Sequence, residues 1–307
     1  MRGNATRYDK IMLLTDLTEK SQAALGYARA MAKYYDAHLV LLHVLPPVEP
    51  LFPSFGPRDG DDHGAIAVRD RLKAMGRALR AEGISVQVRL CRSKVATETI
   101  LRHIRSLRPD IIIQGCGRVA DLRRPFVGSI AEGVFRSTEK PVLTVPAGLK
   151  VPDSAYIQFE RILFATDFGS KVNSIANYAF ALAEEFGARA YLCHVRAPSA
   201  KNVREDGTSV LCDAELHRLI APSVSDWCES QCVVEFGKAA NTILKLADSK
   251  KCDLIVLGAH ALGRFGTRGR PGTVFRVIAA ANCPVLTILD EKRENERRVE
   301  ELEVVAL

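Results

Sequence analysis

The sequence lacks the long apolar segments that mark a membrane protein. None of its hydrophobic runs approaches the roughly 20 residues that a membrane-spanning helix needs, and Met1 to Lys10 holds no apolar signal-peptide core. These absences predict a cytoplasmic protein with no membrane partner. The apolar fraction of 47% and the charged fraction of 26% are those of an ordinary globular protein.

Paired cysteines are missing as well. The eight cysteines form no CxxC pair, and Cys228 with Cys232 is the only close pair in the sequence. Structural zinc sites need about four ligands at tight spacings. We therefore expect no metal site and interpret the cysteines as reduced, mostly buried thiols.

The motifs of several enzyme classes are also absent. The sequence contains no GxxxxGK[ST] segment, whose lysine reaches the terminal phosphates in P-loop proteins. It contains neither a GxSxG elbow nor an HExxH helix. These absences argue against fast catalysis, and we expect no catalytic residue.

Charge of one sign is in excess, but it is not concentrated. The net charge is +7 and the pI is near 9.0, which raises the question of a nucleic-acid partner. The basic residues are interspersed with acidic ones and lack interleaved aromatic residues. We interpret the charge as solvated surface and expect no nucleic-acid partner.

What the sequence does hold is an internal repeat. Four segments recur in the same order, with offsets of 151 positions from Asp16 to Asp167 and 143 positions from Gly115 to Gly258. The pairs are Ile11 to Asp16 with Ile162 to Asp167, Leu42 to Val44 with Cys193 to Val195, Asp110 to Gly115 with Asp253 to Gly258, and Pro141 to Val145 with Pro284 to Ile288. Chance does not readily produce four ordered matches, so we infer a duplicated domain. We expect domains at 8–147 and 158–290, a linker near Ala147 to Phe159, and a charged tail at 291–307.

Strands and helices are predicted to alternate within each half. In the first half, strands are expected at Lys10 to Asp16, Leu39 to Val44, Val86 to Leu90, Ile111 to Gly115 and Val142 to Val145, and helices at Thr18 to Tyr35, Ala65 to Ala81, Thr97 to Leu107 and after Ser129. Thr18 is expected to cap its helix. The segment Pro46 to Gly64 is rich in Pro, Gly and Asp, which predicts a mobile loop. Such alternation requires a parallel sheet with helices on both faces, so the fold class is α/β with two tandem five-stranded, Rossmann-like domains.

A candidate anion site lies between Ile111 and Ser129. A β-branched strand ends at Gly115, an arginine-containing loop follows, and a helical pattern begins after Ser129. A helix N-terminus exposes unpaired N–H groups and the positive end of its dipole. Gly128 allows close backbone approach to a ligand, and Ser129 offers a hydroxyl that caps the helix or binds phosphate.

This stretch resembles the Gly-x2-Gly-x9-Gly-Ser/Thr signature of ATP-binding universal stress proteins. Gly115, Gly128 and Ser129 match the outer positions, whereas Arg118 stands where the second glycine is expected. An arginine there either pairs with a phosphate or fills its space. The resemblance to a tandem member of this family covers nearly the whole chain. It implies an adenine nucleotide alpha hydrolase-like fold, ATP as the ligand, and a pseudo-dimer of the two halves joined through their last strands.

The resemblance also implies roles for individual residues. The aspartate after the first strand meets the adenosine part of the nucleotide, although it could equally be a helix-initiating acid, and the backbone of the second-strand valine reads the adenine edge. In the second half Ala261 replaces a motif glycine, and Pro271 replaces the glycine before the helix. The loop between them either binds phosphate or is a flexible surface loop. We interpret His43 and His194 as structural. The predicted nucleotide-binding residues are Asp16, Val44, Gly115, Arg118, Gly128 and Ser129 in the first half and Asp167, Val195, Gly258, Gly272 and Thr273 in the second.

Three functions remain open at this point. The first is an ATP-binding regulator of a stress response, with at most slow ATP hydrolysis and with binding favoured in the first half. The second is a scaffold for dimerisation or for a protein partner with degenerate sites, which Arg118 and Ala261 favour. The third is an adenylyl-transferring enzyme, but such enzymes usually carry a Ser-Gly-Gly-x-Asp-Ser loop where this chain has Thr15 to Thr18. A homodimer and the involvement of magnesium stay open.

Overall fold

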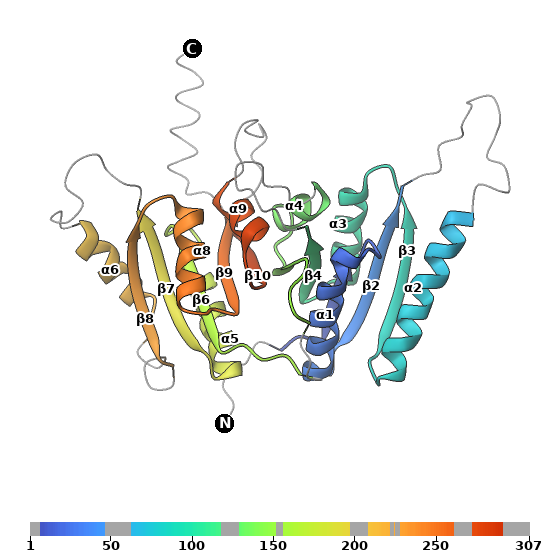
Figure 1. The fold of residues 1–307 in the computed structure, drawn as a ribbon, viewed down its shortest axis with the longest axis horizontal. Helices are drawn as coiled ribbons and strands as arrows, with labels where there is room; N and C mark the ends of the chain where they lie inside the picture. The colour runs from blue at the N-terminus through green and yellow to red at the C-terminus, as the bar shows by residue number, and fades with distance from the viewer. Residues whose placement is uncertain are drawn as a thin grey trace, which may run out of the picture.

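One mixed sheet runs through the whole molecule (Figure 1). The computed structural model describes residues 7–46, 63–117, 129–151, 156–196, 208–221, 224, 228–260 and 272–290. Within these residues ten strands form a single sheet in the order β3-β2-β1-β4-β5-β10-β9-β6-β7-β8. Each half contributes five neighbouring strands, as the repeat predicts.

The two halves have the same succession of strands and helices. The first half consists of β1 Lys10–Leu14, α1 Gln22–Tyr35, β2 His38–Leu45, α2 His63–Ala81, β3 Val86–Arg92, α3 Ala96–Leu107, β4 Ile111–Cys116, α4 Ser129–Phe135 and β5 Val142–Pro146. The second half consists of β6 Arg161–Thr166, α5 Val172–Phe186, β7 Arg189–Arg196, α6 Thr208–Arg218, β8 Ser230–Phe236, α8 Ala239–Ser249, β9 Leu254–His260, α9 Thr273–Ala280 and β10 Val285–Asp290. All strand pairs within a half are parallel. The predicted α/β class is confirmed.

The halves join through their last strands. β5 and β10 pair antiparallel, with Leu143 opposite Leu286 and Val142 opposite Thr287. The Thr287 hydroxyl donates a hydrogen bond to the Val142 carbonyl at 3.2 Å. This is the pseudo-dimer that the family resemblance implies, and it places the two halves in mirrored strand order on either side of the junction.

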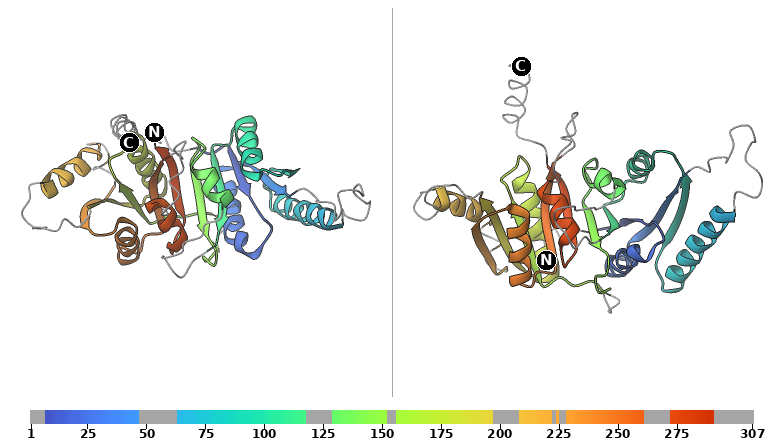
Figure 2. Two further views of the ribbon diagram at one scale, coloured as in Figure 1. Left: turned by 90° about the horizontal axis from the view of Figure 1, so that it is seen from above. Right: turned by 45° about the horizontal axis from the view of Figure 1, so that its top comes forward.

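Two apolar layers cover the sheet because its strands are buried on both faces. Residues Ile11 and Leu13 of β1 pack on the side of α1, α2, α5 and α6, whereas Met12 and Leu14 face α3, α4, α8 and α9. Each layer continues across the junction from one half to the other. Helices therefore lie on both faces, as Figure 2 shows from above. In the described part of the chain no helix is both long enough and apolar enough to span a bilayer.

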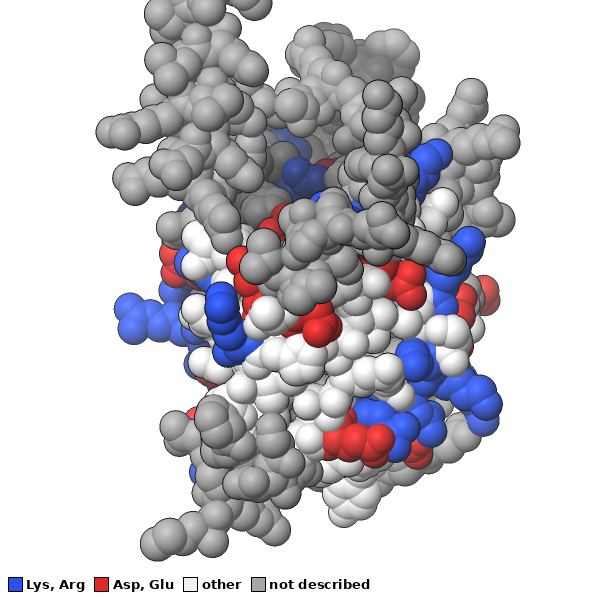
Figure 3. Space-filling view, turned by 90° about the vertical axis from the view of Figure 1, so that its left-hand side faces the viewer, with Lys and Arg blue, Asp and Glu red and all other residues white. Residues whose placement is uncertain are grey.

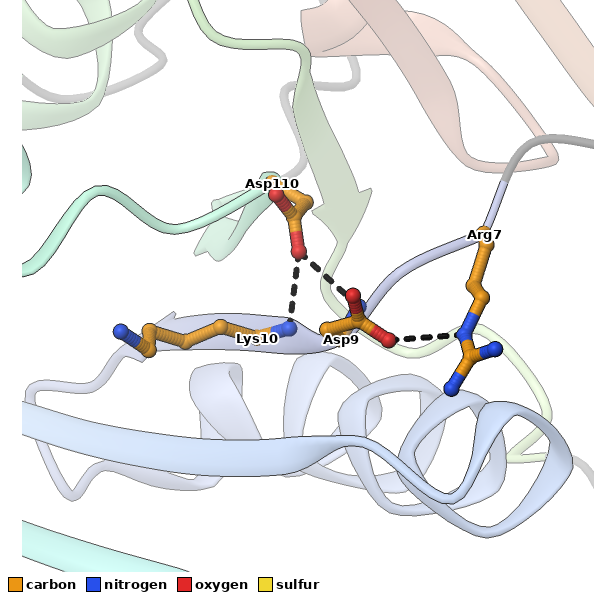
Figure 4. A network of polar contacts seen from close by, with 4 residues as sticks. All are labelled: Arg7, Asp9, Lys10 and Asp110. Carbon is orange, nitrogen blue, oxygen red and sulfur yellow. Dashed lines mark hydrogen bonds and ion pairs between the residues drawn. The ribbon is translucent and has the colours of Figure 1, made fainter.

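The beginnings of the strands are tied by a repeated aspartate. The Asp110 Oδ2 atom accepts hydrogen bonds from the backbone N–H groups of Asp9 and Lys10, each at 2.9 Å (Figure 4). Its counterpart Asp253 accepts from Glu160 at 2.7 Å and from Arg161 at 3.1 Å. Both contacts hold the beginning of a half's first strand against the beginning of its fourth strand, at the edge opposite the strands' carboxyl ends.

The start of the first helix differs from the prediction. A single 3-10 turn, Glu19–Ser21, precedes α1, which begins at Gln22 rather than at Thr18. The Thr18 hydroxyl does not cap the helix, because it donates to the Asp16 carboxylate at 2.8 Å. Strand β1 likewise ends at Leu14, two residues before the predicted end. Most of the predicted Pro46 to Gly64 loop and the whole charged tail lie outside the described residues.

Candidate functional site

A tight turn follows the first strand of each half. The Thr15 hydroxyl accepts a hydrogen bond from the Leu17 N–H at 3.1 Å, and Thr166 accepts one from Phe168 at 2.9 Å. Leu17 and Phe168 have φ angles of 60° and 59°, a left-handed conformation that costs energy for side chains of this size. The fold keeps this conformation twice, and the turn places an aspartate at the carboxyl edge of the sheet in each half.

The two aspartates, Asp16 and Asp167, are exposed at that edge. The Asp16 carboxylate accepts hydrogen bonds from the Thr18 N–H at 2.9 Å and from the Thr18 hydroxyl at 2.8 Å. Burial opposes ionisation of Asp16, but the hydrogen bonds from Thr18 and Ser21 outweigh it and hold the pKa of this carboxyl below its usual value. Asp16 is therefore ionised and held in place at neutral pH.

The histidine of the second strand makes the same contact in both halves. The Nδ1 atom of His43 lies 2.6 Å from the Thr15 carbonyl, and that of His194 lies 2.8 Å from the Thr166 carbonyl. A carbonyl only accepts, so Nδ1 carries the proton in each case. Each histidine thus ties its strand to the turn that presents the aspartate.

A cavity of about 250 Å³ opens at the carboxyl edge of the second half. It lies where β6, β7 and β9 end and where α8 and α9 begin, which is the general ligand position of open α/β sheets. The five residues predicted for the second half all line it. They are Asp167, Val195, Gly258, Gly272 and Thr273.

The walls of this cavity differ in chemistry. Apolar side chains of Phe164, Ile175 and Ile243 form part of its lining. On another side α9 begins at Thr273, and its N-cap residue Gly272 offers no side-chain hydrogen bond to the first turn. No N-cap side chain therefore occupies the backbone N–H groups at that helix end, which point toward the cavity rim. The arrangement suits a ligand with a flat apolar part and an anionic part.

The structure brings together fewer of the residues predicted in the first half. Asp16 follows β1, Val44 lies near the end of β2 opposite Cys91, and Gly115 lies near the end of β4 opposite Val145. These three therefore lie at the same carboxyl edge. Arg118 and Gly128, together with the side chain of Ser129, lie outside the described residues.

Beyond the five predicted residues, the cavity is lined by residues that were not predicted, among them Ala239, Phe135 and Arg136. Ala239 begins α8, Phe135 is the last residue of α4 in the first half, and Arg136 follows it directly. Local motif spacing does not indicate a residue from the other half of the chain. The signal that could have found them is the pairing of the last strands, which brings the end of α4 next to β10.

The cysteines whose side chains the structure describes, which are all except Cys212, are free thiols. Burial raises the pKa of Cys193 to about 12, and burial together with the nearby Asp253 carboxylate raises that of Cys252 to about 12. Such thiols are protonated and unreactive at neutral pH. Among the described residues no group of three or more His, Cys, Asp or Glu side chains is arranged to hold a metal ion.

Charges of both signs share the surface. On the side drawn in Figure 3, basic and acidic side chains lie next to one another among uncharged residues. Ion pairs also form elsewhere on the described surface, such as Lys33 with Glu82 at 2.6 Å in the first half. Mixed charge of this kind matches the interspersed charges of the sequence.

Comparison with known proteins gives one family. The model of the Universal stress protein family matches residues 7–146 and 158–288. A universal stress protein of Mycolicibacterium smegmatis is 24% identical over 309 residues, covering 94% of this chain and 99% of its own length. One from Thermus aquaticus is 30% identical over 135 residues, covering 42% of this chain and 98% of its own. The crystal structure of a universal stress protein from Archaeoglobus fulgidus shares the fold with a TM-score of 0.71 at 21% identity, covering 92% of this chain and 98% of that one.

Proposed function

Since this chain belongs to the universal stress protein family, we propose that it binds an adenine nucleotide, namely ATP, and acts as a regulator in a stress response. The observation that carries the proposal is the cavity in which the five residues predicted for the second half meet. The proposed role is binding rather than turnover.

The lining of the cavity, rather than its size, supports a nucleotide. Its volume of about 250 Å³ lies just below the range of roughly 300–1,000 Å³ typical of small-molecule sites. We assign the enclosed part to the base and ribose and the open side, at the N-terminus of α9, to the phosphates. There the helix dipole and the N–H groups of the first turn stabilise negative charge.

The polar groups at the rim then contact the ligand. The Asp167 carboxylate accepts hydrogen bonds from the ribose hydroxyls, and the backbone of Val195 contacts the edge of the base. Gly258 and Gly272 carry no side chains, so the backbone there approaches the ligand closely. The apolar floor contacts the face of the base.

We also propose ATP binding in the first half. Gly115, Gly128 and Ser129 match the family signature, and the sequence alone favours this half for ATP. The cavity described above supports ATP binding in the second half. We therefore propose that the second-half site binds ATP independently of the first-half site.

Isothermal titration calorimetry with ATP tests the proposal on a matched pair of variants. Ala239 lines the cavity, and Ala96 holds the matching position at the start of α3, 143 positions earlier. We expect the wild-type protein to bind ATP. Ala239→Leu should lose binding at the second-half site because the larger side chain fills the cavity, and Ala96→Leu should keep binding at that site. Absence of binding at millimolar ATP would refute the nucleotide proposal and leave the partner scaffold. Equal affinities in both variants would refute the assignment to the second-half cavity.

A further inference from the structure

The end of α4 reaches across the junction between the halves. α4 lies against β10 of the second half, and α9 lies against β5 of the first. The two helices lie on the same face of the sheet, near the middle of the view in Figure 1. As a result Phe135 and Arg136, which belong to the first half by sequence, line the second-half cavity.

This crossing follows the pseudo-symmetry of the duplication. With the 143-residue offset, Phe135 corresponds to Ile278 and Cys116 corresponds to Ala259. Phe135 lines the cavity together with Ala259, and the Cys116 thiol lies 3.9 Å from the Ile278 carbonyl. Each half therefore presents the end of its last helix to the carboxyl edge of the other half.

The next residue breaks the symmetry. Arg136 follows Phe135, whereas Ala279 follows Ile278. At this pair of matching positions, the second-half site therefore receives a guanidinium group from the opposite half, whereas Ala279 offers the first-half site only a methyl group. The sequence repeat marks this difference, because the surrounding strand segments match while this position changes from arginine to alanine.

The Arg136 side chain is aimed at the start of α9. A Cβ atom built on Gly272 would lie 3.6 Å from its Nη2 atom. The side chain is 21% exposed, and its Nε atom lies 3.2 Å from a Glu132 carboxylate oxygen. That contact is an ion pair without hydrogen-bond alignment, and among the described residues Nε has no hydrogen-bond partner. Glu132 thus orients the guanidinium but leaves its hydrogen-bonding capacity unused at this atom.

The electrostatics of this placement favour an anion. A cation beside a helix N-terminus is unfavourable, because the helix dipole is positive there. A phosphate at this point would contact both positive groups at once, and a guanidinium fork matches phosphate oxygens in a bidentate arrangement. A neutral ligand would leave the two positive groups facing each other.

We infer that Arg136 of the first half binds a phosphate group of the nucleotide held in the second half. The inference rests on the proposed nucleotide function. It makes the second site a product of both halves and gives it a phosphate contact from a position where the repeat has Ala279.

The test separates phosphate binding from a structural role. ATP and adenosine are titrated by calorimetry into protein carrying Ala96→Leu, and then into the same protein with Arg136→Gln, with Arg136→Lys, or with Arg102→Gln. Arg102 is exposed on α3, so its replacement removes the same charge away from the cavity.

We expect Arg136→Gln to weaken ATP binding by about 10- to 100-fold, as the loss of a hydrogen bond between charged groups does. Adenosine binding should change by less than about twofold, Arg136→Lys should restore part of the ATP affinity, and Arg102→Gln should have no effect. Unchanged ATP affinity in Arg136→Gln, or equal losses for ATP and adenosine, would overturn this inference alone. If the parent protein binds neither ligand, the proposed function and the inference both fail.

Discussion

Replacing Asp110 and Asp253 by asparagine should destabilise the protein to different degrees, although the two residues hold matching places in the repeat. Both hydrogen bonds to Asp110 end on the same oxygen, Oδ2. Those to Asp253 end on different oxygens, at 2.7 Å on Oδ2 and 3.1 Å on Oδ1. Asparagine has one carbonyl oxygen and one NH2 group. It keeps both bonds at position 110, but at position 253 its NH2 group faces a second N–H donor.

The difference can be estimated from these contacts. Each variant turns hydrogen bonds to a charged acceptor into neutral ones, which costs about 1 kcal/mol. Asp253→Asn adds about 1–3 kcal/mol for a backbone N–H left without an acceptor. Burial raises the pKa of Asp253, so removing its charge offsets part of that cost. We expect Asp253→Asn to be less stable than Asp110→Asn by about 1–2 kcal/mol, or about 2–8 °C in Tm.

Differential scanning calorimetry of the wild type and both variants at pH 7 measures this difference. A pH series adds a second signature. Because the folded-state pKa of Asp253 lies above its unfolded value near 3.9, the folded state binds more protons between the two values. This group therefore adds stability as the pH falls through that window, and Asp253→Asn removes the gain. Equal Tm values for the two variants at pH 7 would refute the hydrogen-bond assignment.

Three further predictions concern single residues. Because the folded-state pKa of Asp16 is lowered, the stability that this carboxylate contributes is present above about pH 3.9 and is lost as the pH falls towards the folded-state pKa. Asp16→Asn should therefore lower the free energy of unfolding by less than about 1 kcal/mol at pH 7 and not at all below the folded-state pKa, as thermal melts at the two pH values would show. Gln114→Leu, which copies Leu257 of the second half, should lower the free energy of unfolding in urea by about 1–3 kcal/mol, because it breaks two buried hydrogen bonds; no change would contradict this. Cys193 and Cys252 should resist iodoacetamide in native protein at pH 8 because their pKa values are near 12, and rapid labelling seen by peptide mass spectrometry would disprove it.

Much of the fold follows from local patterns. The β-branched and leucine-rich strands, the helices between them and the offset repeat indicate two parallel α/β units before any coordinates are known. The junction of β5 with β10 is different, because a strand buried on both faces carries no mark of its partner. It came from the family resemblance instead. The start of α1 was wrong because the Asp16 carboxylate competes with the helix for the Thr18 hydroxyl.

The site was predictable only in part. The second-half residues Asp167, Val195 and Gly258 were predicted from the repeat and the family resemblance, and they do line one cavity. Motif spacing favoured the first half, since Gly128 and Ser129 match the signature. Arg136 was missed because it lies in the other half of the chain and reaches the cavity through a long-range contact.

Native mass spectrometry of the intact protein with added ATP tests the central claim most directly. The account predicts that Ala239→Leu carries one bound nucleotide fewer than the wild type, whereas Ala96→Leu still carries the nucleotide of the second half. A wild-type protein without bound nucleotide, or an Ala239→Leu variant that binds as many as the wild type, would contradict the claim that the second-half cavity holds an adenine nucleotide.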